Sequence, residues 1–288
     1  MNTIGDTVSM FKVCLQTHTN SIEQVCEFWN RRPCNIRHST KPICTREYFD
    51  EVEERKYFVE AHIPDFAQFN KWRNKKVLEI GCGIGTDSIN FARAGADITV
   101  IDISAKSIEI CKKRFHVYGL KAHFYCGDAE KLSVFVPIET YDLIYSFGVI
   151  HHTPHPRIVF EEIKKYCKPE TEIRIMLYSK FSWKVLWSIL TCGKGAFWRA
   201  DEIVRTYSEA QTGCPVTYCY TFRDIRRLMK DYKIIKIQKD HIFPYKIKKY
   251  INYQYEWVWY FRWIPRPLFR WLESHFGWHS LIFARPGE

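Results

Sequence analysis

The chain has 288 residues, of which 46% are hydrophobic, and a formal net charge of +11. This length supports one large α/β domain with appended elements rather than two full-size domains. No window approaches the ~18 consecutive apolar residues of a membrane span, and residues 1–16 are too polar for a signal peptide. The eleven cysteines are irregularly spaced, which argues against a disulfide framework. We therefore expect a cytoplasmic protein.

The first part of the chain is predicted to be helical. Residues 21–30 carry apolar side chains at helical spacing, and residues 31–43 contain two prolines and are predicted to be loop. Thr45 is placed to cap a second helix whose first turns hold acidic residues.

From Lys76 to Tyr178, short β-rich runs alternate with helical segments. This alternation predicts βαβ units on a parallel sheet. Irregular insertions are expected near 179–220 and near 239–276, on either side of a sixth strand, and the run SLIFARP close to the end predicts a final strand. We therefore place one domain at 71–288, with these two insertions.

A glycine-rich turn follows the first predicted strand, in the run VLEIGCGIGT at 77–86. Glycine at 81, 83 and 85 lets the backbone approach a ligand where any Cβ would collide, and the following helix N-terminus attracts a carboxylate. The spacing differs from the G-x-G-x-x-G of dinucleotide sites. Glu79 would oppose a pyrophosphate and suits a ligand with an ammonium group. The alternative is a structural or nucleotide-binding turn.

Two further acids follow the next two predicted strands. Asp102 ends ITVID, where a carboxylate can accept hydrogen bonds from both hydroxyls of a ribose. Asp128 can accept from an adenine amino group, although each acid alone can equally be a helix cap. Acids at three successive strand ends favour a ligand, because ligands of open α/β sheets bind there.

With the run YDLIYSFGVIHHTP at 141–154, these motifs resemble the class I S-adenosylmethionine-dependent methyltransferases, especially the group that includes quinone-ring and sugar O-methyltransferases. The resemblance covers residues 76–178. It implies S-adenosyl-L-methionine as cofactor and a Rossmann-like seven-stranded sheet with an antiparallel last strand. Separately, we expect residues 1–70 to form a helical lid. The cofactor-binding residues that we predict are Glu79, Gly81, Cys82, Gly83, Gly85, Asp102, Ile103, Asp128, Ala129, Ser146 and Phe147.

Candidate catalytic residues follow the fourth and fifth strands. His151 and His152 are expected beside the transferred methyl group, and histidine titrates near neutrality, so one of them can remove a hydroxyl proton. We favour His152; the alternative is that each histidine packs against the loop backbone. Tyr178 is a second-rank candidate to orient the acceptor. We expect no metal at this histidine run, because no carboxylate or thiol lies at ligand spacing.

Other candidates are less defined. The polar run at 208–215 can line an acceptor pocket or be a surface loop. His241, just past the sixth strand, is similarly ambiguous. In the lid, the residues that we single out as shielding the reaction from water are Tyr48, Tyr57 and His62.

The stretch 246–276 combines aromatic and basic residues. Eleven aromatic side chains lie between 250 and 276, and residues 221–270 hold 13 Lys/Arg against 4 Asp/Glu, a net of +9. This combination suits peripheral contact with a membrane surface or stacking on nucleic-acid bases. Alternatively, these aromatic side chains pack on the core or form a dimer contact. The oligomeric state does not follow from the sequence.

Three acceptors compete. A small molecule with a hydroxyl ranks first, followed by a lipid-linked or quinone-like acceptor at a membrane surface. RNA ranks last, because the run at 146–149 departs from the Asn/Asp-Pro-Pro-aromatic motif of methyltransferases acting on base amines. Outside methyl transfer, an NAD-dependent dehydrogenase is disfavoured by the glycine spacing, and a non-catalytic cofactor-binding protein by the intact acids and glycines.

Overall fold

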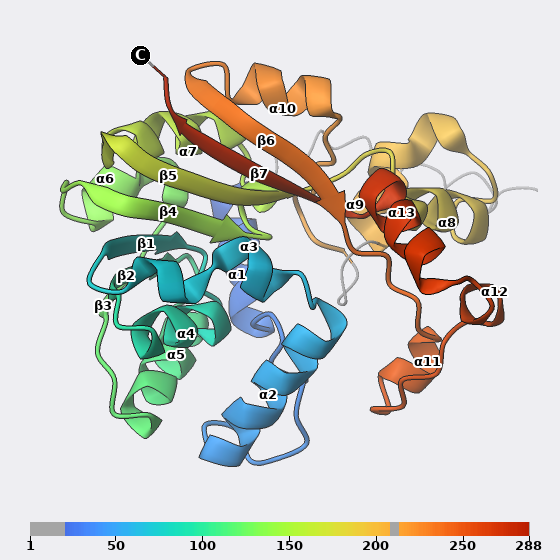
Figure 1. Ribbon diagram of the computed structural model, residues 1–288, viewed down its shortest axis with the longest axis horizontal. Helices are drawn as coiled ribbons and strands as arrows, with labels where there is room; N and C mark the ends of the chain where they lie inside the picture. Colours follow the sequence, from blue (N-terminus) through green and yellow to red (C-terminus); the bar gives the residue numbers. More distant parts are fainter. Residues whose placement is uncertain (1–20, 208–212, 288) are drawn as a thin grey trace, which may run out of the picture.

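The computed structural model describes residues 21–207 and 213–287, which are built around one seven-stranded sheet (Figure 1). The strand order is β3-β2-β1-β4-β5-β7-β6. The first five strands pair in parallel, whereas β7 runs antiparallel to both β5 and β6. This confirms the predicted sheet. The strands are β1 (Lys76–Ile80), β2 (Asp97–Asp102), β3 (His123–Cys126), β4 (Tyr141–Phe147), β5 (Cys167–Tyr178), β6 (Tyr232–Asp240) and β7 (His279–Pro286).

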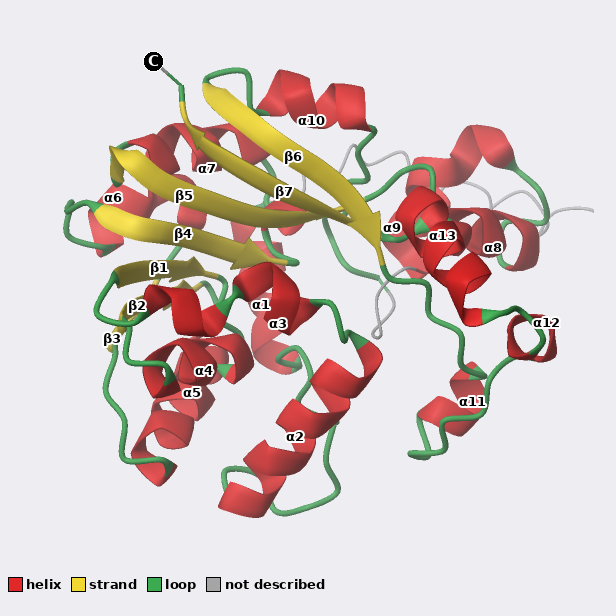
Figure 2. Cartoon of the chain, in the orientation of Figure 1, coloured by secondary structure: helices red, strands yellow, loops and turns green. Residues whose placement is uncertain are grey.

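Helices cover both faces of the sheet (Figure 2). Successive side chains of a strand point to opposite faces, so Val77 joins the core beneath one set of helices and Leu78 the core beneath the other. On the first face lie α4 (Thr86–Arg93) and α5 (Ala105–Val117). The elements on the second face are α6 (Leu132–Phe135), α7 (Pro156–Lys164) and α10 (Phe222–Leu228). Short 3₁₀ turns join these layers at η2 (Ala129–Lys131) and η3 (Ile150–His152).

The segment before the sheet is helical, as predicted. Ser21 and Thr45 each accept a hydrogen bond from the third backbone N–H of the helix that they start. The elements of this segment are α1 (Ile22–Arg31), α2 (Arg46–Val59), α3 (Ile63–Ala67) and η1 (Phe69–Trp72).

Buried cations fix helix α2 in place. Lys56 forms an ion pair of 2.7 Å with Asp87 of α4, and Arg114 of α5 donates to the carbonyl of Phe49. On the other side, Arg55 donates to the carbonyl of Tyr250 at 2.6 Å and lies over its ring. Helix α2 is therefore tied both to the sheet domain and to the second insertion.

The two insertions pack together at the end of the sheet where β6 and β7 meet (Figure 1). Trp183 of the first insertion contacts the rings of Tyr260 and Phe261 of the second. The insertions contain α8 (Trp183–Thr191), η4 (Phe197–Arg199), α9 (Ala200–Tyr207), α11 (Ile247–Tyr250), α12 (Trp259–Arg262) and α13 (Arg266–Phe276).

Candidate active site

A cavity lies at the carboxyl ends of the parallel strands, where the strand order reverses between β1 and β4. This switch point is where open α/β sheets bind ligands. Helices α1 and α2 close the cavity from the side of the N-terminal segment. The predicted site residues that line it are Gly81, Cys82, Gly83, Asp102, Ile103, Asp128, Ala129, Phe147, His152 and Tyr178.

The glycines of the turn are needed for different reasons. A Cβ on Gly81 would lie 2.1 Å from the Val149 side chain, and one on Gly85 would lie 2.5 Å from the sulfur of Cys111. Packing within the protein therefore also requires glycine at these two positions, and ligand approach to them stays a prediction. At Gly83, which lines the cavity with φ of +53°, a Cβ would have no atom of the described residues within 4 Å, so this glycine leaves space for a ligand.

Asp102 joins the end of β2 to the glycine turn. Its two carboxylate oxygens accept from the backbone N–H groups of Gly83 and Ser104, each at 2.8 Å. Each oxygen keeps a lone pair that can accept from a ligand hydroxyl. Burial raises the pKa of Asp102 to about 6, against the lowering effect of the two N–H donors.

Asp128 is a cap, as the alternative interpretation predicted, and its contact with an adenine amino group stays a prediction. It caps η2 by accepting from the N–H of Glu130 at 2.8 Å, and it also lines the cavity. Burial raises its pKa above the ordinary aspartate value. Capping and ligand binding are compatible here because the cap engages one oxygen only.

Glu79, Gly85 and Ser146 lie behind the cavity wall rather than in it. Glu79 is buried and accepts from the Ser88 hydroxyl, and burial together with the nearby charge of Asp87 raises its pKa to about 8. The Ser146 hydroxyl donates to the carbonyl of Ile80 and so ties β4 to β1. These residues support the turn; direct cofactor contact by them stays a prediction.

The two histidines after β4 differ in their surroundings. The Nδ1 atom of His152 lies 2.8 Å from the carbonyl oxygen of Val216, which can only accept, so this nitrogen carries the proton and Nε2 is the basic one. The His151 ring is fully buried against the Tyr178 ring, with centroids 3.7 Å apart. Burial lowers its pKa well below the ordinary value. The His152 residue borders the cavity with its Nε2 atom buried, whereas the His151 ring packs against Tyr178.

Part of the polar run at 208–215 lies outside the described residues, at 208–212. Of the remainder, the sulfur of Cys214 lies 3.5 Å from Nδ1 of His152. The described part of the first insertion thus orients His152 from behind and does not line the cavity.

Several cavity residues were not foreseen. Lys56 and Glu60 come from helix α2 and its C-terminal cap, Trp29 from α1, and His279 from the first position of β7. For Lys56, Glu60 and Trp29, the sequence predicted only that they belong to a helical lid. His279 reaches the cavity because β7 runs antiparallel to β5 and so begins at the carboxyl ends of the parallel strands. No local pattern indicates that the residue just before the predicted final strand lines the cavity.

The segment that contains most of the cavity residues is similar to known methyltransferases. Residues 77–170 match the family model described as Methyltransferase domain. The ubiquinone biosynthesis O-methyltransferase of Photobacterium profundum is 26% identical over 137 residues, or 43% of this chain and 58% of that enzyme. Its namesake in Haemophilus ducreyi is 33% identical over 99 residues, or 33% and 42% of the two chains. The chain therefore spans about half the length of these relatives.

Solved structures share the fold at low identity. The magnesium protoporphyrin IX methyltransferase of Synechocystis PCC 6803 with bound SAH superposes with a TM-score of 0.56 at 16% identity, over 92% of this chain and 99% of that one. The PH0226 protein of Pyrococcus horikoshii OT3 gives 0.54 at 18% identity, over 90% and 98%.

The distinct roles of the glycines are testable by substitution with alanine. Gly81→Ala should lower the free energy of unfolding by about 2–4 kcal/mol, because its methyl group collides with Val149 and the backbone is left-handed. Gly83→Ala adds only the left-handed backbone cost of about 1–2 kcal/mol. Chemical denaturation measures both; equal losses for the two variants would contradict this assignment.

Proposed function

We propose that the chain, whose residues 77–170 match a methyltransferase family model, transfers the methyl group of S-adenosyl-L-methionine to a hydroxyl of a small-molecule acceptor. The observation that carries this proposal is the meeting of Asp102, Gly83 and His152 at one cavity. Binding groups for the cofactor and a candidate base for the acceptor thus share one space.

The residues of the cavity fit this cofactor. Asp102 retains acceptor capacity for ribose hydroxyls, and Gly83 leaves space beside the turn. The N-terminus of helix α4 would bind the cofactor carboxylate. Asp128 and Ala129 lie where an adenine ring would meet a polar and an apolar wall. When bound, the cofactor would supply an electrophilic methyl group on a sulfonium, which the acceptor would attack in line with the carbon–sulfur bond.

His152 is the proposed base. With the cofactor bound, Nε2 of His152 would accept the hydroxyl proton as the acceptor oxygen takes the methyl group from the sulfonium. The hydrogen bond from Nδ1 to Val216 holds the ring in this tautomer. Tyr178, fixed between His151 and Trp278, forms a flat wall against which an acceptor ring can be oriented.

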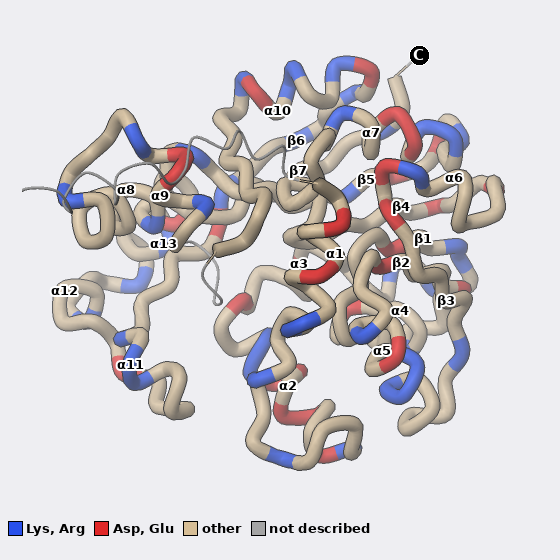
Figure 3. The backbone as a smooth tube through the Cα atoms, turned by 180° about the vertical axis from the view of Figure 1, so that it is seen from behind, with Lys and Arg blue, Asp and Glu red and all other residues tan. Residues whose placement is uncertain are grey.

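We further propose a quinone-like acceptor that is met at an anionic membrane surface. The relatives named above act in ubiquinone biosynthesis, and Trp259 and Trp263 are 72% and 79% exposed. Phe261 and Phe269 are buried between the insertions, so core packing explains only part of the aromatic stretch. Lys and Arg recur along α11 and α12 (Figure 3). In the described part of the chain, no helix is long and apolar enough to cross a membrane.

Cofactor binding is tested by titration calorimetry with S-adenosyl-L-methionine and with NADH. Only the ionised carboxylate of Asp102 can accept both ribose hydroxyl hydrogens, and burial raises its pKa to about 6. The affinity of the wild type for S-adenosyl-L-methionine should therefore decrease as the pH is lowered from 7 to 5. Below pH 6 the decrease should be at most about tenfold per pH unit. Asp102→Asn should bind at least tenfold more weakly at pH 7.5 and lose this pH dependence.

Asp97→Asn, at the exposed start of the same strand, is the matched control and should bind as wild type does. Binding of NADH without S-adenosyl-L-methionine would overturn the proposed function.

The base is tested with His152→Ala and a panel of phenol and quinol acceptors. Turnover of the best acceptor should fall at least tenfold, and about 10²-fold where deprotonation limits the rate. His116→Ala, an exposed histidine on α5, should turn over normally. Unchanged turnover in His152→Ala would remove this residue as the base.

Membrane contact is tested by co-sedimentation with vesicles that contain phosphatidylserine. The Trp259→Ala, Trp263→Ala double variant should bind at least fivefold more weakly, and 0.5 M salt should weaken wild-type binding because it screens the basic residues. Ile138→Ala, which removes an exposed apolar side chain before β4, serves as control. No vesicle binding at low salt would reject the membrane surface.

A further inference from the structure

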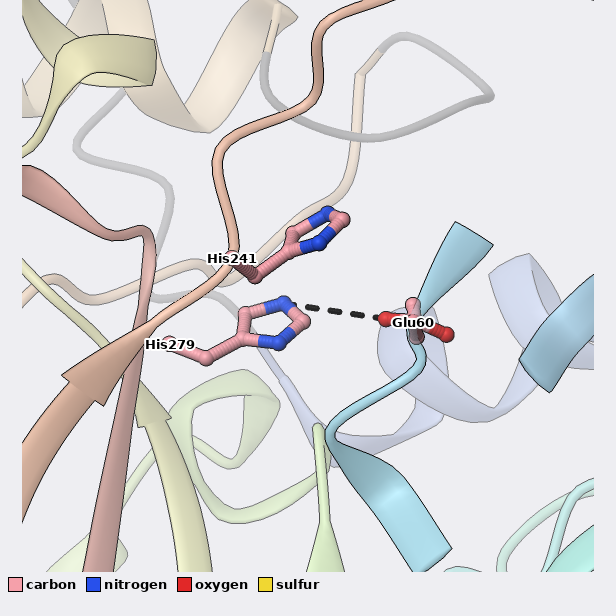
Figure 4. A group of neighbouring side chains, drawn as sticks. All are labelled: Glu60, His241 and His279. Atoms are coloured by element: carbon pink, nitrogen blue, oxygen red, sulfur yellow. Dashed lines mark ion pairs between the residues drawn. The ribbon is translucent and has the colours of Figure 1, made fainter. Parts of the chain in front are cut away.

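Two histidines and a glutamate converge beside the cavity, from three segments far apart in the sequence (Figure 4). Glu60 follows helix α2, His241 follows β6, and His279 begins β7. One ligand atom from each lies within 4.8 Å of the other two, and Oε1 of Glu60 is 3.7 Å from Nε2 of His279.

The backbone holds the two histidines together. Asp240 pairs with His279 across β6 and β7, which places His241 next to this pair, and the two imidazoles stack with centroids 4.6 Å apart. His241 has a φ of +71°, a left-handed conformation that is uncommon for residues other than glycine. Hydrogen bonds of its N–H to Asp240 and of its carbonyl to the N–H of Trp278 maintain it. Such a conformation at a buried polar residue is a common mark of a functional position.

His62 provides the outer contact that metal-ligating histidines usually have. Its Nε2 lies 3.0 Å from Nδ1 of His279, and the pair is buried. If Nε2 of His279 binds a cation, its Nδ1–H donates to His62. This arrangement fixes the tautomer and the orientation of the ligating ring.

We propose that Glu60, His241 and His279 bind a divalent transition-metal ion, with zinc as the expected ion. Two imidazoles and one carboxylate are a donor set for zinc and its neighbours rather than for magnesium or calcium, which prefer oxygen ligands alone. Three protein ligands leave a coordination position open, as in catalytic rather than structural zinc sites.

The open position faces the methyl-transfer cavity. Glu60 and His279 line that cavity, whereas His241 lies behind them. The Tyr178 ring lies between the two candidate centres, 5.7 Å from the His152 ring and 6.1 Å from the His279 ring. The ion would therefore bind an oxygen atom of the acceptor and hold the acceptor at the cavity wall. This role rests on the proposed methyl transfer, whereas metal binding itself does not.

The test is titration of the chelator-treated full chain with Co²⁺, followed by its visible absorption bands. Wild type should bind one equivalent with the intense bands of a four- or five-coordinate site, and Zn²⁺ should displace it. His241→Gln should bind at least 100-fold more weakly, and His62→Gln about 10–100-fold more weakly. His116→Gln is the matched control and should match wild type.

Two further readouts separate this proposal from the proposed function. Acetohydroxamate, an oxygen-donor probe, should shift the Co²⁺ bands of wild type, and an unshifted spectrum would overturn the open position. Absence of stoichiometric Co²⁺ binding, or equal binding by wild type and His241→Gln, would overturn the metal site. Calorimetry of the same samples with S-adenosyl-L-methionine reports independently on the cofactor cavity, so each proposal can fail without the other.

Discussion

The carboxylate of Asp102 is the contact on which the rest of the site depends. By accepting from the N–H groups of Gly83 and Ser104, it joins the end of β2 to the turn that follows β1. These bonds hold the turn open at the sheet's switch point while leaving the carboxylate at the cavity surface. Burial raises its pKa to about 6, against the lowering effect of these two N–H donors.

The cavity has two halves with different origins. The strands of the sheet supply the cofactor half, and this is the segment that the methyltransferase family model matches, at 77–170. The flanking segments supply the other half: α2 contributes Lys56 and Glu60, β7 contributes His279, and the first insertion orients His152 through Val216. Lys56, Glu60 and His279 thus lie outside the residues that the family model matches.

Local patterns were sufficient to predict the parallel strands and the place of Asp102, because both follow from alternating strands and helices and from residues at strand ends, whereas the antiparallel last strand was predicted from the family resemblance. They were not sufficient for Glu79, since only packing against Ser88 determines that this carboxylate lies beneath the turn. They also did not separate His151 from His152, whose rings are in contact and both buried, although only His152 lines the cavity. The grouping of Glu60, His241 and His279 depends on long-range chain reversal, which spacing along the sequence cannot reveal.

A crystal structure of the chain with S-adenosylhomocysteine tests the central claim most directly. The account predicts both ribose hydroxyls at about 2.7 Å from the carboxylate oxygens of Asp102, with the amino-acid tail over the turn at 81–85. A ligand bound elsewhere, or a ribose whose hydroxyls meet other groups while Asp102 stays engaged only with the backbone, would contradict it.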